Sequence, residues 1–199
     1  MGVHSAVGNG TFVAVGLPSG SFASPGGADR MRALTRYALS LAGISYEQSP
    51  LLAIERGEIT AVQALDNPVM LEGRYLDLFD PGLPVVEDQT LDPGQSALLL
   101  ELSPVSTPGV PRYAHGGGRL CSAITEEPCR TAFSLAGPKN SATTTRVLGN
   151  GRTPRSVEID GRRFGSFTAF WEERSGSLLL TIQHQTADTV AVEILWDEA

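Results

Sequence analysis

The sequence predicts a mainly β protein made of antiparallel, sandwich-like domains, with one N-terminal α-helix at about residues 28–42. Two observations predict this class. Short apolar runs recur between turn residues along most of the chain, which is typical of strands in antiparallel sheets. One segment near the N-terminus instead repeats its apolar residues at steps of three and four, which is the period of a helix face.

Residues 1–45 are expected to hold one strand and this helix. GTFVAVGL (10–17) is an apolar run of strand length, and a Gly/Pro/Ser-rich loop follows it. Asp29 suits the N-cap or the first helical turn, and Gly43 stands where a helix stops. The apolar positions of the helix are Met31, Leu34, Ala38 and Leu41.

Residues 46–104 predict a small antiparallel β domain. LLAIERGEITAVQAL indicates two strands that fold back at Arg56-Gly57, and VMLEGRYLDLF indicates a third. Asp80-Pro81-Gly82 and Asp92-Pro93-Gly94 are turns, because Pro fixes φ and Gly accepts positive φ. Between and after these turns, LPVV and QSALLLEL complete the set of strands.

Residues 119–199 predict a β-sandwich of roughly seven or eight strands. Residues 103–118 are rich in Pro, Gly and Ser, so we expect a linker or a long surface connection there. Asp160-Gly161 favours a hairpin turn. The last strand candidate places four apolar residues on one face: Val190, Val192, Ile194 and Trp196.

Composition limits the partners. The net charge is −7 and the 15 Lys and Arg are dispersed, which disfavours nucleic acid and anionic membranes. No apolar run approaches the roughly 20 residues of a membrane helix. The N-terminal sequence lacks the features of a signal peptide, so a cytoplasmic chain, slightly favoured, or one cut from a longer protein is expected.

The two cysteines, Cys121 and Cys129, flank a predicted hairpin. Two buried thiols are the simpler interpretation, and a disulfide is the alternative if the two side chains face each other. Two cysteines and three distant histidines do not form a metal-ligand spacing, and no cofactor motif is present.

Catalytic groups are not indicated. Glu72 and Asp77 would point to opposite faces of a strand, and Asp80 is better explained as a turn former. No G-x-S-x-G motif accompanies the histidines, which we expect to be surface imidazoles. They are His4, His115 and His184.

The aromatic run FGSFTAFWEE is the best candidate for a ligand contact. Aromatic faces pack on pyranose rings, and Phe164, Phe167 and Phe170 do not share one strand face, so some of these rings must point outward. We therefore select Trp171, Phe170 and Phe167 as candidate carbohydrate-binding residues. Core packing is the alternative, and it is favoured for Trp196.

One family resemblance follows from the run LLAIERGEITAVQALDN…LEGRYLDLFDPGLPVVEDQTLDPGQSALLLEL. It resembles the C-terminal β-rich region of large bacterial glycoside-hydrolase-like proteins, in which a barrel is followed by a flavodoxin-like, glutamine-amidotransferase-like domain and then by β domains. GNGTFVAVGLPSGSF with its helix resembles the end of that flavodoxin-like domain. The ending RSVEIDGRRF…SLLLTIQH…VAVEILW is similar to that of many accessory β-sandwiches. The resemblance implies that the catalytic acids lie in the barrel, so no catalytic residue is transferred to this chain.

Three hypotheses for function follow. The first is a non-catalytic accessory region of a glycoside-hydrolase-like protein, which contacts a catalytic domain, a second copy of the chain or carbohydrate. The second is an independent carbohydrate-binding module. The third is a small hydrolase that uses Asp77 or Asp80 with a histidine.

Overall fold

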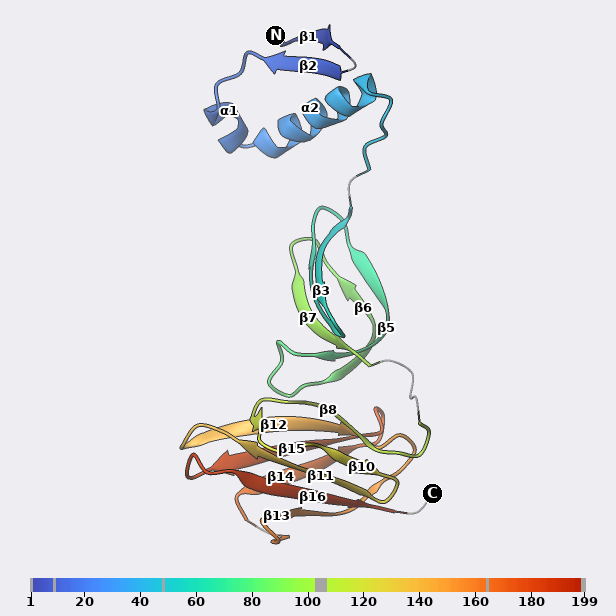
Figure 1. Cartoon of the computed structure of the whole chain (residues 1–199), viewed down its shortest axis with the longest axis vertical. Helices are drawn as coiled ribbons and strands as arrows, with labels where there is room; N and C mark the ends of the chain where they lie inside the picture. Colours follow the sequence, from blue (N-terminus) through green and yellow to red (C-terminus); the bar gives the residue numbers. More distant parts are fainter. Residues whose placement is uncertain (1, 9, 48, 103–106, 164, 198–199) are drawn as a thin grey trace. The chain divides into compact units, whose positions relative to one another are not determined.

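A computed structural model describes residues 2–8, 10–47, 49–102, 107–163 and 165–197. Its contacts divide the chain into two compact units, Met1–Ser49 and Pro50–Ala199. The described residues form antiparallel β-sheets and only short helices, so the predicted mainly β class is confirmed (Figure 1). The segments 46–104 and 119–199 both lie in the second unit.

The first unit is a β-hairpin with two helices. Strand β1 (Gly2–Val7) pairs with β2 (Gly10–Val15), and helix α1 (Gly20–Ala23) precedes α2 (Gly27–Leu41). β2 confirms the predicted strand. β1 has no counterpart among the predicted elements, because GVHSAV lacks the apolar alternation of a half-buried strand.

Helix α2 confirms the predicted helix with a shift of one residue. Gly26, at φ +76°, stands at its N-cap, so Asp29 lies in the first turn, where it forms an ion pair with Arg32 at 3.1 Å. After the last turn Gly43 takes φ +70°, a conformation that ends many helices. The single turn α1 lies inside the predicted loop.

The second unit begins with a five-stranded sheet. Its strands are β3 (Leu51–Arg56), β4 (Ile59–Ala64), β5 (Val69–Asp77), β6 (Val85–Leu91) and β7 (Ser96–Glu101), in the order β3-β4-β7-β5-β6. All of the strands predicted between residues 46 and 104 are confirmed. The Asp80 carboxylate accepts a hydrogen bond from the Gly82 N–H at 2.7 Å, and Gly94 takes φ +83°, so both Asp-Pro-Gly segments turn the chain.

Two sheets pack face to face in the rest of the second unit. One has the order β10 (Thr125–Glu127), β11 (Arg130–Ala136), β16 (Val190–Trp196) and β13 (Pro154–Ile159), with β9 (Arg119–Leu120) also paired to β11. The other has the order β14 (Phe167–Glu172), β15 (Ser177–His184), β12 (Ser141–Leu148) and β8 (Arg112–Gly116). These sheets form the predicted sandwich.

The sandwich core comes from alternate positions of its central strands. The predicted inward face of β16 is confirmed, since Val192, Ile194 and Trp196 are buried and Val190 packs against them. The Trp196 indole N–H donates to the buried Thr131 hydroxyl at 3.0 Å. The other buried members of this cluster are Phe133, Leu135, Val147, Leu178, Leu180 and Ile182.

Two sandwich predictions need correction. Residues 112–116 lie inside the segment expected to be a connection, yet they form β8, which pairs with the edge of β12. Asp160-Gly161 does form a tight turn, with φ +48° and +70°, but only one bridge, Ile159 to Arg162, follows it. β13 then pairs with β16 instead of β14, because the chain crosses to the other sheet.

The five-stranded sheet and the sandwich share a small apolar cluster. Leucines from both parts are buried there, and the partly buried Ile59, Leu78, Val85 and Ala114 pack around them. The buried members are Leu76, Leu83, Leu100, Leu102 and Leu148.

Arg146 of β12 joins the two parts by hydrogen bonds. Its side chain donates to the carbonyl oxygens of Leu83 at 2.9 Å and Gly82 at 3.0 Å, in the β5–β6 connection. Within the sandwich it donates to the Ser177 hydroxyl and to the Glu172 carboxylate, both at 3.1 Å. Burial lowers the pKa of Arg146, and the Glu172 carboxylate opposes that shift.

Candidate ligand-binding site

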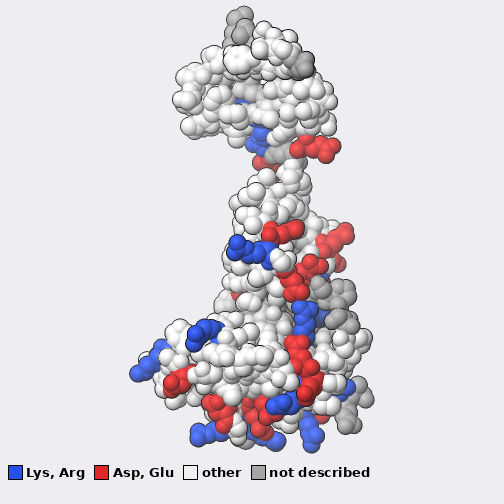
Figure 2. Space-filling view, in the orientation of Figure 1, with Lys and Arg blue, Asp and Glu red and all other residues white. Residues whose placement is uncertain are grey.

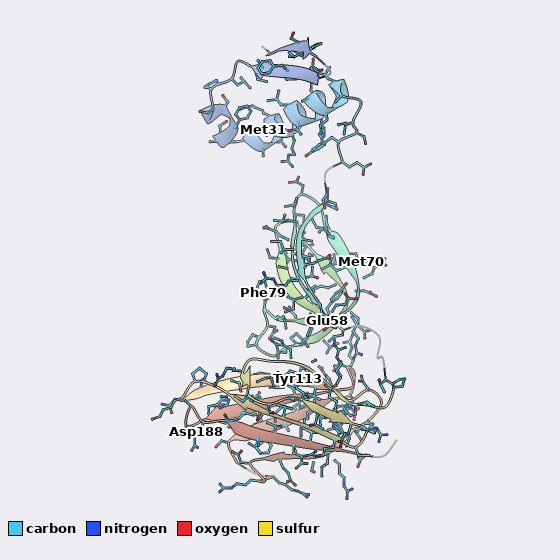
Figure 3. All side chains as sticks on the ribbon, in the orientation of Figure 1. Met31, Glu58, Met70, Phe79, Tyr113 and Asp188 are labelled. Atoms are coloured by element: carbon cyan, nitrogen blue, oxygen red, sulfur yellow. The ribbon has the colours of Figure 1, made fainter. Side chains whose placement is uncertain are left out.

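A cavity lies at one end of the sandwich, where the chain crosses between the two sheets. Its volume is about 340 Å³, within the range of small-molecule sites. The β13–β14 and β15–β16 connections supply half of the lining residues, and the ends of the adjoining strands supply the rest. Asp188, labelled in Figure 3, marks the β15–β16 connection. The lining residues are Ile159, Asp160, Arg162, Gly165, Ser166, Phe167, Ile182, Gln183, His184, Gln185, Thr186 and Val190.

The Asp160-Gly161 turn fixes one wall of the cavity. Oδ1 of Asp160 accepts a hydrogen bond from the Ala191 N–H at 2.9 Å, and the Asp160 N–H donates to the Ala191 carbonyl at 2.9 Å. Both central residues of the turn need positive φ, which Asp tolerates and Gly favours. The carboxylate is therefore held in place with Oδ2 left to accept a further hydrogen bond.

The floor of the cavity is apolar and its rim is polar. Phe167 and Ile182, paired across β14 and β15, both reach the sandwich core from the cavity side. At the rim, the Gln185 side-chain amide donates to the Ser166 hydroxyl at 3.2 Å. The Arg162 guanidinium makes no ion pair within the described part of the chain. An apolar surface thus lies beside a carboxylate, a guanidinium, amides and hydroxyls.

His184 is a buried histidine, which corrects the expectation of a surface imidazole. Its side chain is 2% exposed, and its Nε2 is hydrogen-bonded to the Thr143 hydroxyl at 2.8 Å. A Cβ on Gly137 would lie 2.5 Å from the ring, so glycine at that position makes room for it. In SLLLTIQH, His184 continues the inward positions of Leu178 and Ile182 at steps of two, a signal by which its burial was predictable.

The three predicted carbohydrate-binding residues lie on two faces of β14. Phe167 lines the cavity. Trp171 also faces the core, where its ring meets Trp196 edge-to-face at 6.3 Å between centroids. Phe170 lies on the opposite face and is 63% exposed. The structure therefore does not bring these rings into one row, and Phe164 lies outside the described residues.

The predicted acid–base candidates serve the backbone instead. Asp77 Oδ1 accepts a hydrogen bond from the Phe79 N–H at 2.9 Å, and Asp80 caps its turn in the same way. His4 lies in the other unit and is hydrogen-bonded to the Tyr37 hydroxyl at 2.8 Å. His115 is half-buried on β8, and burial lowers its pKa. No contact between these carboxylates and a histidine is present among the described residues.

Among the described residues, the cysteines form neither a disulfide nor a metal site. Cys121 and Cys129 are free and exposed, which corrects the expectation of buried thiols; Cys129 lies in the β10–β11 turn. No group of three potential metal ligands occurs among the described residues. On the face shown in Figure 2, Lys and Arg are scattered among Asp and Glu. The described helices include none long and apolar enough to span a membrane.

The polar residues of the cavity were not among the predicted site residues. Asp160, Arg162, Gln183 and Gln185 are common surface types, and they meet only because the β13–β14 connection lies beside the end of β15 and the connection that follows it. Comparisons with protein-family models, curated proteins and solved structures found no match.

Proposed function

We propose that this chain is a non-catalytic accessory region of a glycoside-hydrolase-like protein, and that it binds carbohydrate in the cavity at the end of the sandwich. The supporting observation is the combination of the Phe167 ring and an apolar floor with a polar rim. A sugar has an apolar C–H face and a hydroxyl edge. Aromatic rings pack on the first, and carboxylate, amide and guanidinium groups hydrogen-bond to the second.

The composition of the cavity also supports binding over hydrolysis. Glycoside hydrolysis ordinarily requires two carboxylates on either side of the bond that breaks. Asp160 is the single carboxylate among the described residues that line the cavity. The hydrogen bond from the Ala191 N–H fixes the position of this carboxylate, which can therefore accept a hydrogen bond from a hydroxyl group of the sugar.

The test is a glycan-array screen of the purified chain, with two variants of β14. Phe167→Leu removes the ring that lines the cavity, and Phe170→Leu makes the same chemical change on the opposite face of the strand. Loss of one aromatic contact is expected to weaken binding about three- to tenfold. Phe170→Leu is expected to bind like the unchanged chain.

A third variant tests the polar rim. Gln185→Ala removes one hydrogen-bonding group at the surface, with an expected loss of about two- to tenfold. Trp171 does not line the cavity, and its ring packs edge-to-face against the buried Trp196, so its loss would report on the stability of the sandwich. Sensitivity to Phe170→Leu alone would place the sugar on the outer face of the sheet, and no retention of any glycan by the folded protein would contradict carbohydrate binding.

A further inference from the structure

A second cavity lies on one face of the five-stranded sheet, and its chemistry differs from that of the first cavity. Its volume is about 240 Å³. Apart from Gly57 in the β3–β4 turn, its lining residues come from β3, β4, β5 and β7 and share one face of the sheet. They are Leu51, Ala53, Glu55, Gly57, Thr60, Val62, Leu71, Tyr75, Leu99 and Glu101, and we call this cavity the β3–β7 trough.

The floor of the trough is apolar. Val62 and Leu99 are buried members of the core of this sheet, and Leu51, Leu71 and Tyr75 pack against them while remaining partly exposed. An aliphatic chain or a small ring bound here would bury apolar surface that is now exposed to solvent, which favours binding.

The rim of the trough carries negative charge without compensation. Glu55 of β3 and Glu101 of β7 are exposed and make no ion pair among the described residues. By contrast, Glu58 (labelled in Figure 3) pairs with Arg112 at 3.1 Å outside the trough. No Lys or Arg belongs to the described lining residues.

The charge of Glu101 reaches Tyr75, its cross-strand partner. Burial raises the pKa of Tyr75, and the charges of Glu101 and Asp88 add to that shift. The Tyr75 phenol donates its O–H to the Glu72 carbonyl at 2.7 Å, so this O–H is not donated to the Glu101 carboxylate. The described lining of the trough therefore offers two carboxylates without an ion-pair partner and no cationic side chain.

We propose that the β3–β7 trough binds an organic ammonium ion, with its apolar part on Val62, Leu71 and Leu99 and its cationic head between Glu55 and Glu101. Charge complementarity selects a cation, and the apolar floor selects one with a hydrocarbon chain over a metal ion or free ammonia. The same chemistry is offered by a free alkylamine and by the side chain of a lysine in a partner protein. This site is separate from the carbohydrate cavity and does not depend on it.

In the first experiment the full chain is titrated with each of three six-carbon probes, and binding is measured from the amide chemical shifts in NMR spectra. Hexylammonium is expected to bind more tightly than hexanol, its neutral analogue, and hexanoate is expected not to bind. Equal affinity for hexanol and hexylammonium would overturn the role of the carboxylates. Nα-acetyl-lysine amide represents the lysine side chain of a partner protein, and hexylammonium represents a free alkylamine. The cation that binds more tightly identifies which of these two the trough recognises. If neither cation binds, the proposal is overturned.

Variants locate the site. Glu55→Gln and Glu101→Gln are each expected to weaken hexylammonium binding about fivefold, as for partly screened ion pairs. Glu173→Gln, at an exposed turn of the sandwich, removes one charge in the same way and serves as the matched control. Ala53→Phe fills the trough with both carboxylates left in place, and it is expected to abolish binding. Unchanged binding by a folded Ala53→Phe variant would place the amine elsewhere.

Discussion

Replacement of Arg146 by Met is expected to loosen the junction between the five-stranded sheet and the sandwich. Arg146 is 3% exposed and makes four hydrogen bonds, two of them to backbone carbonyls of the β5–β6 connection. Met has a similar length and fills much of the same volume. The substitution therefore removes the donors and the charge while it keeps most of the packing.

The expected cost follows from the groups left behind. Two carbonyl oxygens, of Gly82 and Leu83, lose their only described side-chain donor, and an unsatisfied buried acceptor costs about 1–3 kcal/mol. Glu172 loses its ion pair, but it is partly exposed and still accepts from the Ser175 hydroxyl at 2.5 Å, so its contribution is small. We expect Arg146→Met to lower the free energy of unfolding by about 3–5 kcal/mol. Arg146→Lys keeps the charge and is expected to lose about half as much, because an ammonium cannot reach all four acceptors.

Guanidinium unfolding followed by tryptophan fluorescence measures this effect. Both tryptophans of the chain, Trp171 and Trp196, lie in the sandwich, so the signal reports the part that contains Arg146. Arg174→Met is the matched control, since Arg174 is exposed and makes no ion pair within the described residues. The control is expected to stay within about 0.5 kcal/mol of the unchanged chain. An Arg146→Met variant as stable as this control would refute the reasoning.

Two further predictions concern stability. Burial lowers the pKa of His115 in the folded chain below its ordinary value of 6.5, so the unfolded chain binds that proton first as the pH falls. The free energy of unfolding is therefore expected to decrease below pH 6.5. His115→Asn is expected to lose less of this free energy on acidification, in unfolding curves measured from about pH 7.5 to 5. Gly149→Ala is expected to lower the free energy of unfolding by about 1–3 kcal/mol, because a Cβ would lie 2.2 Å from the Arg152 carbonyl oxygen and 2.7 Å from the Trp171 ring. Gly165→Ala is the control: a Cβ there has no atom within 4 Å, so the unfolding midpoint is expected to stay unchanged. Equal effects of the two substitutions would contradict this packing.

Elements with a strong local pattern were predictable. Each Asp-Pro-Gly turn in residues 46–104 breaks the chain between apolar runs, and the strands follow from these breaks. β1 and β8 were missed because an edge strand needs only one neighbour and little burial, so its sequence carries no clear alternation. The cysteines are exposed because Cys129 occupies a hairpin turn and Cys121 lies just after β9, positions that hydropathy does not reveal.

The candidate sites were harder to predict because tertiary contacts create them. Phe167 was identified as an aromatic candidate, but its cavity needs Asp160 and Gln185 from connections that meet only when β13 and β15 lead to opposite sheets. Glu55 and Glu101 lie far apart in sequence and share the trough because β4 joins β3 to β7. Composition alone cannot show which charged residues remain without a partner.

The most direct test of carbohydrate binding at the end of the sandwich is an amide NMR titration of the full chain with the glycan that the array retains. Binding in the cavity predicts the largest shifts at Ser166, Gln183, Gln185 and Thr186, with little change at Phe170 on the opposite face of β14. Shifts centred on Phe170, with the cavity residues unchanged, would contradict the proposed site.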